Sequence, residues 1–112
     1  MASGRRLTVE FYQSPDGRSP FIEWLEAIGD LETVQRIRHR IERFELGNLG
    51  DTKPVKGRSG LFDARLFFGP GYRMYFTLET NRRVVLLFGG NKKTQRGDVR
   101  KAAALLDAYR SE

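Results

Sequence analysis

The chain has 112 residues, enough to bury one hydrophobic core, and it contains no cysteine, which excludes disulfides and thiolate metal sites. It carries a formal net charge of +6, and no apolar run approaches the roughly 18 residues of a membrane span. Residues 1–6 lack the apolar core of a secretion signal and are expected to be disordered. We therefore expect a single cytoplasmic domain over residues 1–112.

The chain begins with a predicted strand and a predicted helix. Apolar and polar residues alternate over residues 7–12, as in a strand, and residues 14–17 read Ser-Pro-Asp-Gly, which is typical of a turn. Ser19 can cap a helix that begins at Pro20, a residue type favoured at the first helical position, and Gly29 can end it. Apolar residues at i, i+3, i+4 and i+7 of this helix should face the core. They are Phe21, Trp24, Leu25 and Ile28.

A second helix is predicted from Asp30, its candidate cap, to about Gly47. Its apolar stripe should also be buried, and charges of both signs on its other sides indicate a solvated surface. The only histidine of the chain, His39, lies among those charges. The stripe consists of Leu31, Val34, Ile37, Ile41 and Phe44.

The second half of the chain predicts three strands joined by tight turns. Residues 47–54 are expected to form a loop, and residues 55–60 a basic, flexible approach to the first of these strands. Aromatic and apolar residues on both sides of a turn over residues 69–71 indicate a hairpin, and a second turn is predicted over residues 79–82. The nearly continuous apolar run over residues 83–88 is typical of a strand covered on both faces.

A glycine-hinged basic loop over residues 89–94 should then leave the sheet and lead to a last helix that begins within residues 95–98. The resulting order β-α-α-β-β-β-α predicts a small α+β sandwich. In it, an antiparallel meander has the two N-terminal helices packed on one face. The opposite face is expected to stay uncovered and to carry Arg65, Arg73 and Tyr75.

The predicted hairpin brings two arginines together. Side chains alternate between the faces of a strand, so Arg65 and Arg73 should lie on one face, directly or diagonally opposed. Like charges opposed across strands are unfavourable unless an anion joins them, and the pair therefore indicates a phosphate or carboxylate site. The arginine face would also carry Asp63, Tyr75 and Thr77, and the core face Leu66, Met74 and Phe76.

The usual catalytic centres are missing from the sequence. A lone helical histidine is rarely catalytic, and no nucleophile-elbow motif accompanies His39. The sequence has no HExxH motif, and its carboxylates do not cluster at metal-ligand spacing. The Gly69-Pro70-Gly71 segment lacks the rest of a dinucleotide or phosphate-loop fingerprint. We therefore expect neither a metal nor a cofactor.

Arginine, lysine and tyrosine side chains remain, and such groups can cleave RNA without a metal. The RNA 2′-hydroxyl is the nucleophile, so the protein has only to move protons and stabilise a phosphorane. Arginine matches phosphate oxygens, and a lysine crowded by other cations can exchange protons nearer neutral pH. The whole excess charge lies in residues 57–112, which favours a polyanionic partner, with solubility alone as the alternative. Tyr75, on the arginine face, can stack on an unpaired base.

Three segments of the second half form one specific pattern: Asp63-Ala64-Arg65-Leu66, then Phe68-Gly69-Pro70-Gly71-Tyr72-Arg73-Met74-Tyr75-Phe76, then Leu86-Leu87-Phe88-Gly89-Gly90-Asn91-Lys92-Lys93-Thr94-Gln95. This pattern resembles the RelE/ParE toxin superfamily, and most closely its HigB-like branch, the addiction module killer proteins. The similarity extends over roughly residues 7–108 and includes Glu10-Phe11 and residues 21–25. Ala64 departs from the branch, which usually has leucine there, in a way that affects packing more than chemistry.

The resemblance implies the toxin of a type II toxin–antitoxin system with a RelE-like fold. Such toxins inhibit growth as mRNA interferases, which are metal-independent endoribonucleases that cut mRNA in the ribosomal A site without a cofactor. Carried over by position, Arg65 and Arg73 would stabilise the phosphate, and Lys56 or Lys92 would transfer protons. The residues expected to bind RNA are Lys93, Arg58, Tyr75 and Arg96.

The resemblance also implies a partner, a cognate antitoxin with a helix-turn-helix unit, in a toxin–antitoxin hetero-oligomer that occludes the basic face. The same fold hosts ParE-like inhibitors of DNA gyrase that cut no RNA, and fold alone does not decide between the two activities. A basic RNA-binding module without chemistry is a third alternative. The Arg65 and Arg73 pair, together with Lys92 and Lys93, favours the nuclease.

Overall fold

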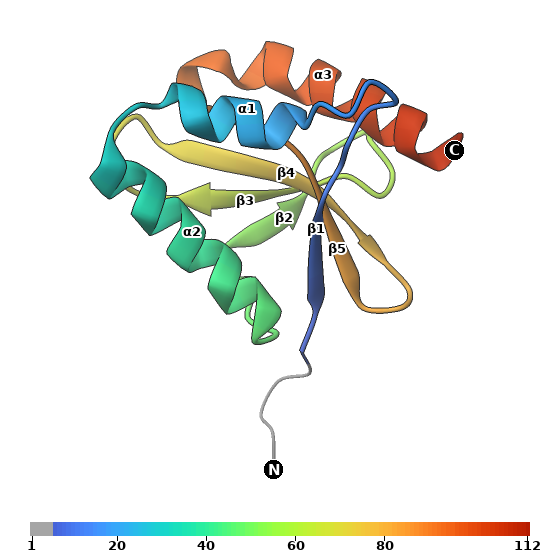
Figure 1. Cartoon of the computed structure of the whole chain (residues 1–112), viewed down its shortest axis with the longest axis horizontal. Helices are drawn as coiled ribbons and strands as arrows, with labels where there is room; N and C mark the ends of the chain where they lie inside the picture. The colour runs from blue at the N-terminus through green and yellow to red at the C-terminus, as the bar shows by residue number, and fades with distance from the viewer. Residues whose placement is uncertain (1–5) are drawn as a thin grey trace.

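Three α-helices and a five-stranded mixed sheet form the α+β fold in the computed structural model, which describes residues 6–112 (Figure 1). The disorder expected at the N-terminus concerns residues 1–5, which lie outside the described residues, and Arg6, which is exposed. No helix within residues 6–112 is long and apolar enough to cross a membrane. In chain order the elements are β1 (Thr8–Phe11), α1 (Pro20–Ala27), α2 (Leu31–Glu45), β2 (Thr52–Pro54), β3 (Phe62–Leu66), β4 (Tyr72–Glu79), β5 (Arg83–Asn91), the 3-10 turn η1 (Lys92–Thr94) and α3 (Gln95–Arg110).

Both N-terminal helices begin where the sequence predicts, because polar side chains cap them. The Ser19 hydroxyl accepts a hydrogen bond from the backbone N–H of Ile22 at 3.3 Å, and Pro20 is the first residue of α1. The Asp30 carboxylate accepts a hydrogen bond from the backbone N–H of Thr33 at 3.3 Å before α2. These bonds satisfy N–H groups that have no partner within the helix, and they therefore fix the two starting points.

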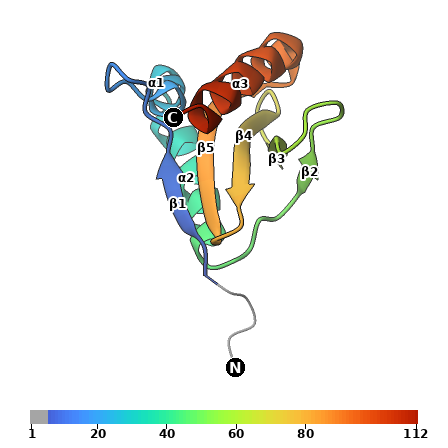
Figure 2. The same cartoon turned by 90° about the vertical axis from the view of Figure 1, so that its right-hand side faces the viewer.

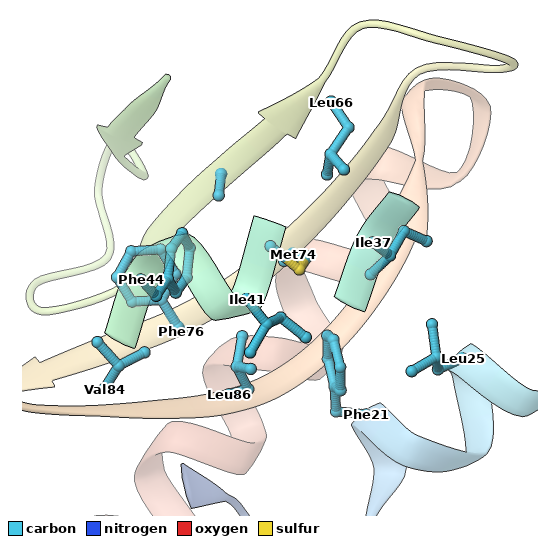
Figure 3. Close-up of a cluster of buried hydrophobic side chains, with 11 residues drawn as sticks. Phe21, Leu25, Ile37, Ile41, Phe44, Leu66, Met74, Phe76, Val84 and Leu86 are labelled. Carbon is cyan, nitrogen blue, oxygen red and sulfur yellow. The ribbon is translucent and has the colours of Figure 1, made fainter. Parts of the chain in front are cut away.

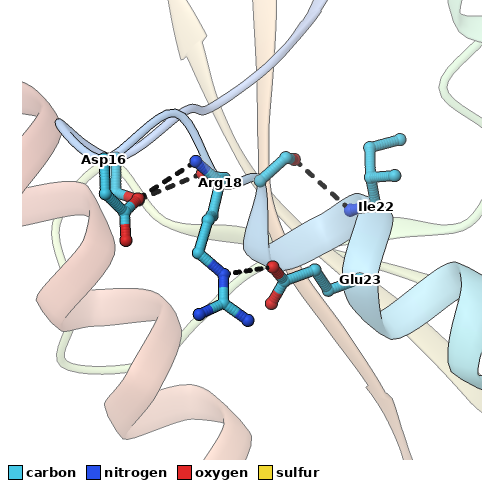
Figure 4. Close-up of polar contacts among 6 residues, drawn as sticks. Asp16, Arg18, Ile22 and Glu23 are labelled. Atoms are coloured by element: carbon cyan, nitrogen blue, oxygen red, sulfur yellow. Dashed lines mark hydrogen bonds and ion pairs between the residues drawn. The ribbon is translucent and has the colours of Figure 1, made fainter.

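The turn before α1 is held by polar contacts (Figure 4). Asp16 Oδ1 accepts hydrogen bonds from the Ser14 hydroxyl and from the Arg18 backbone N–H, and these bonds lower the pKa of Asp16. The Arg18 Nε donates to Glu23, in the first turn of α1, at 2.7 Å. Because this ion pair is largely exposed, it orients the chain more than it stabilises the fold.

The sheet has the strand order β1-β5-β4-β3-β2 (Figure 2). The meander from β3 to β5 is antiparallel, as predicted, whereas β1 runs parallel to β5 and makes the sheet mixed. Thr52–Pro54 lies in the predicted loop but pairs with β3 as an additional strand, so the loop prediction is wrong there. Three residues are too few for an alternating pattern to be recognised in the sequence.

Helices α1 and α2 pack on one face of the sheet, as the element order predicts. Figure 3 shows α2 residues such as Phe44 facing the sheet beside Phe76, and the two ring centroids lie 5.3 Å apart. The buried side chains between the two helices and the sheet form one core cluster, and their positions have the spacing that predicts burial. The cluster consists of Phe21, Leu25, Ile37, Ile41, Phe44, Ala64, Leu66, Met74, Phe76, Val84 and Leu86.

Some residues of the predicted apolar stripes are less buried than expected. Trp24, Ile28 and Val34 are half-buried at the border of the core. Leu31 is 70 % exposed, so its predicted burial is wrong. Helical spacing places Leu31 on the correct side of α2, but at the first position of the helix, where no other element packs over it.

The opposite face of the sheet is not uncovered, because α3 packs on it (Figure 2). The apolar side of α3 needs a surface to bury against, and β5 offers Val85 and Leu87 on that face. The prediction that this face of the sheet is uncovered is therefore wrong, because it did not consider where the apolar side of the last helix is buried. The resulting second cluster is Tyr12, Leu61, Tyr75, Val85, Leu87, Ala102, Ala103 and Leu106.

Strand β5 continues through Gly89 and Gly90, so the prediction that the chain leaves the sheet there as a loop is wrong. Neither glycine has a positive φ. Their role is close approach: a Cβ on Gly89 would collide with the Trp24 ring, and one on Gly90 with the Asp98 carboxylate. The two glycines therefore let α1 and α3 approach the sheet from its two faces.

Candidate functional site

The two hairpin arginines lie directly opposite each other across β3 and β4. Arg65 pairs with Arg73, and Asp63 pairs with Tyr75 at the next position on the same face. The shared face is therefore as predicted. The Arg65 side chain is 30 % exposed, whereas Arg73 is 8 % exposed. The pair combines one accessible guanidinium with one that is almost buried.

The positive charge of this pair is only partly compensated. The Arg65 Nε donates to Asp63 Oδ1 at 3.3 Å, and Asp63 is buried. Arg73 takes part in no ion pair within residues 6–112, and its buried Nη1 has no hydrogen-bond partner. A buried donor without a partner is costly. A bound anion would compensate the charge of Arg73, which no carboxylate within residues 6–112 neutralises.

Two grooves meet at the arginine pair. The hairpin groove is lined by Arg65 and Arg73, by Lys92 and by the hairpin turn from Leu66 to Tyr72. The second, which we term the basic groove, also contains Arg65 and Lys92 and continues between the β2–β3 segment and the start of α3. The basic groove is lined by Lys53, Pro54, Val55, Lys56, Arg58, Asp63, Arg65, Lys92, Lys93, Gln95, Arg96, Val99 and Arg100.

The structure brings the predicted cationic residues together along these two grooves. Arg73 lines the hairpin groove only, and Arg65 and Lys92 line both. The other four predicted cations line the basic groove and are exposed; they are Lys56, Arg58, Lys93 and Arg96. The lining of the basic groove contains eight cationic side chains and one buried carboxylate, so this groove has a strongly positive potential.

Local structure holds the cationic side chains on both walls of the basic groove. The segment that carries Lys56 and Arg58 is closed by a hydrogen bond from the Val55 backbone N–H to the Leu61 carbonyl oxygen at 2.8 Å. On the other wall, the Asn91 side chain accepts hydrogen bonds from the backbone N–H groups of Lys93 and Thr94 in a capping box. This cap presents the two lysines of η1 at the end of β5.

Tyr75 does not lie where the sequence predicts. It is on the arginine face, but its ring is fully buried beneath α3 and does not reach the grooves. The expectation that Tyr75 stacks on an RNA base is therefore corrected. Tyr72, on the opposite parity, lines the hairpin groove instead, with its ring 5.5 Å from that of Phe68.

Replacing Tyr75 with phenylalanine is expected to keep or slightly raise the free energy of unfolding near pH 7, because its buried hydroxyl has no hydrogen-bond partner within residues 6–112. Burial, reinforced by Asp98, raises the pKa of Tyr75 to about 12. Unfolded tyrosine titrates near 10, so the wild type should lose stability between about pH 10 and pH 12 as the unfolded state deprotonates first. Urea unfolding at both ends of this range should show a smaller loss for Tyr75→Phe, and equal losses would contradict this assignment.

Sequence reasoning missed two cationic residues of the basic groove, Lys53 and Arg100. Lys53 was hidden in the predicted loop, since the short strand β2 gives no periodic signal. Arg100 lies one helical turn after Arg96, and this i, i+4 spacing was available in the sequence. Asp63 was expected on the arginine face, but its burial and its contact with Arg65 became evident only from its surroundings.

The histidine and the carboxylates form no further centre in the described part of the chain. His39 is exposed on α2, 3.5 Å from Glu42, and lines neither groove. Within residues 6–112, no three His, Asp or Glu side chains are grouped as metal ligands. The arginine pair and the cations around it are thus suited to binding an anion.

Comparison with known proteins places the chain in a family. No family model matches it, and no solved structure matches it. A curated protein of Haemophilus influenzae strain Rd, named "Uncharacterized protein", is 39 % identical over 85 residues, which cover 76 % of this chain and 84 % of that protein. Such identity over most of both chains shows that the protein described here belongs to the same family as this Haemophilus influenzae protein.

Proposed function

We propose that this protein is the toxin of a type II toxin–antitoxin system, in the HigB-like branch of the RelE/ParE superfamily. Its α+β sandwich is then RelE-like, and it acts as a metal-independent, ribosome-dependent mRNA endoribonuclease. The observation that carries the proposal is the Arg65–Arg73 pair at the junction of two grooves, in which Arg73 makes no ion pair within residues 6–112. A phosphate beside the pair would relieve the repulsion between the arginines.

In the proposed reaction, the scissile phosphate lies beside the arginine pair. The 2′-hydroxyl gives up its proton and attacks phosphorus, and the bond to the 5′ oxygen breaks as that oxygen gains a proton. Arg65 and Arg73 stabilise the dianionic phosphorane between these steps. Lys92, which lines both grooves, and Lys56, which shares the basic groove with Arg65, are the candidates for the two proton transfers.

The exposed cations of the basic groove bind the flanking RNA in this proposal. Arg58, Lys93 and Arg96 lie on both of its walls, so a strand that runs along the groove meets positive charge on each side. An antitoxin with a helix-turn-helix unit would occlude this charge with acidic segments in a hetero-oligomer. The uncompensated charge supports a partner of that kind.

Primer extension on mRNA from cells that express the protein tests the proposal. Translated messages should acquire new 5′ ends at codon positions after induction, and the same messages should stay intact when translation is blocked. Intact messages in growth-arrested cells, together with inhibited DNA supercoiling by purified gyrase, would favour the gyrase-inhibitor alternative. Intact messages without any growth defect would contradict both activities.

Binding of single-stranded RNA is expected to weaken steeply with salt. Each phosphate neutralised by the basic groove should contribute about −0.7 to the slope of log affinity against log salt concentration. A site with four such contacts would give a slope of about −2.8. Fluorescence anisotropy over a range of salt concentrations measures this slope, and a flat response would remove the electrostatic basis of RNA binding.

A further inference from the structure

A third groove, which we term the α2 groove, continues from the hairpin groove towards α2. Both grooves contain Leu66, Phe67 and Phe68 in their walls, so they meet at the hairpin turn. The hairpin groove in turn shares Arg65 and Lys92 with the basic groove. The three grooves therefore form a continuous path that passes the arginine pair and crosses the hairpin turn.

The α2 wall of this path carries mostly positive charge. Arg36, Arg40 and Arg43 follow the spacing i, i+4 and i+7, which places them on one side of the helix. Neighbouring like charges at this spacing destabilise a helix unless an anion compensates them. Glu32, one turn before Arg36, is the only carboxylate in the lining of the groove.

These cations differ in what they already contact. Arg40 donates hydrogen bonds to the backbone carbonyl groups of Leu49, Asp51 and Arg65, so its guanidinium is occupied within the fold. Arg36 and Arg43 make no ion pair within residues 6–112 and are exposed. No carboxylate within residues 6–112 neutralises these two arginines, so both can meet an anionic ligand.

An exposed aromatic ring lies where the α2 groove and the hairpin groove meet. Phe67 is 80 % exposed, the largest value among the exposed large hydrophobic residues of the described chain. Its neighbour Phe68 is half-buried and held by Arg36, whose guanidinium carbon lies 4.1 Å from the centre of the ring. Phe67 thus projects from a supported turn and offers a π-face between two groups of cations.

We propose that this path binds single-stranded RNA beyond the cleavage position, with one base stacked on Phe67 and backbone phosphates at Arg36 and Arg43. The inference rests on the proposed nuclease function and extends its RNA site across the hairpin turn. Single-stranded RNA fits the observations because its charges repeat along a path and its bases stack on exposed aromatic rings. An acidic peptide would account for the cations of the α2 groove alone, but not for their continuity with the arginine pair.

The test compares a short RNA of about four nucleotides with a long RNA of about twelve, lengths that bracket typical single-strand sites. Both carry 2′-O-methyl groups, so that they cannot be cut while fluorescence anisotropy measures their affinity. Phe67→Ala should weaken binding of the long RNA about 5- to 150-fold and leave the short RNA unaffected. Phe67→Trp should retain binding, and Leu46→Ala, which removes an exposed apolar side chain elsewhere on the surface, should change neither affinity.

A second pair of variants tests the phosphate contacts. The double variant Arg36→Gln/Arg43→Gln should reduce the salt slope for the long RNA by about 1.4, the contribution of two phosphates. The double variant Arg36→Gln/Arg38→Gln should reduce it by about half as much, because Arg38 lies on another side of α2 and outside the groove. Circular dichroism should show that each variant is folded.

The outcomes separate this inference from the proposed function. If induced cells contain cut messages but the Phe67 and Arg36/Arg43 variants bind the long RNA as the wild type does, the nuclease stands and the extended path is wrong. If the long RNA binds no tighter than the short one, and a glutamate-rich peptide binds the α2 groove instead, the groove is a protein-binding surface and the inference fails. If messages stay intact and neither RNA binds, both proposals fail.

Discussion

Replacing Arg73 with alanine is expected to lower RNA cleavage by about 10²–10³-fold, the usual cost of removing one preorganised donor from a developing negative charge. Arg73 lines the hairpin groove and makes no ion pair within residues 6–112, so its positive charge is available to a bound phosphate. Cells that express the variant should grow normally, and primer extension on their translated messages should show no new ends.

The same change is expected to leave the fold intact. Removing Arg73 eliminates a positive charge opposite Arg65, which should offset the cost of the lost packing, so the thermal midpoint should change little. Arg73→Lys keeps the charge but not the planar fork, and it should restore only part of the activity. Arg38→Gln removes one charge outside the grooves and serves as the matched control.

Full toxicity of a folded Arg73→Ala variant would argue against the nuclease mechanism. The alternative would then be gyrase inhibition, which does not require a phosphate clamp. If Arg73→Ala is non-toxic because it does not fold, Arg65→Ala tests the arginine pair instead. Arg65 is more exposed, so its removal leaves a smaller void. A folded Arg65→Ala variant that still cuts messages would contradict the assignment of the pair.

Replacing Phe44 with alanine is expected to lower the free energy of unfolding by about 3–5 kcal/mol. The Phe44 side chain is fully buried between α2 and the sheet, and its ring lies 5.3 Å from that of Phe76. The change removes the transfer free energy of a whole ring and leaves a cavity that two packed layers cannot close. Chemical denaturation followed by circular dichroism measures this loss.

Leu31→Ala is the matched control for Phe44→Ala, since both residues belong to the predicted apolar stripe of α2. Leu31 is 70 % exposed, so its replacement should change the free energy of unfolding by less than about 0.5 kcal/mol. Comparable losses in the two variants would mean that α2 packs on the sheet in another rotation, and the positions of Arg36 and Arg43 would change with it.

The site was predictable from sequence where it depends on the period of a strand. A two-fold period around the Gly69–Gly71 turn is sufficient to place Arg65 opposite Arg73, and the structure has this register. The same period assigns Tyr75 to the arginine face, but it does not say how far along that face another element extends. Burial of Tyr75 follows from the packing of α3, a contact distant in sequence.

Local patterns were therefore enough for the helix starts, the hairpin and the choice of core side for most apolar residues, because caps, turns and periodicity act over a few neighbouring residues. Tertiary structure alone decided the parallel pairing of β1 with β5, the covering of the second face by α3 and the junction of the grooves. These features depend on packing between apolar surfaces that are far apart in the sequence. Hydrophobic burial is non-directional, so a sequence shows which residues must leave water but not which partner covers them.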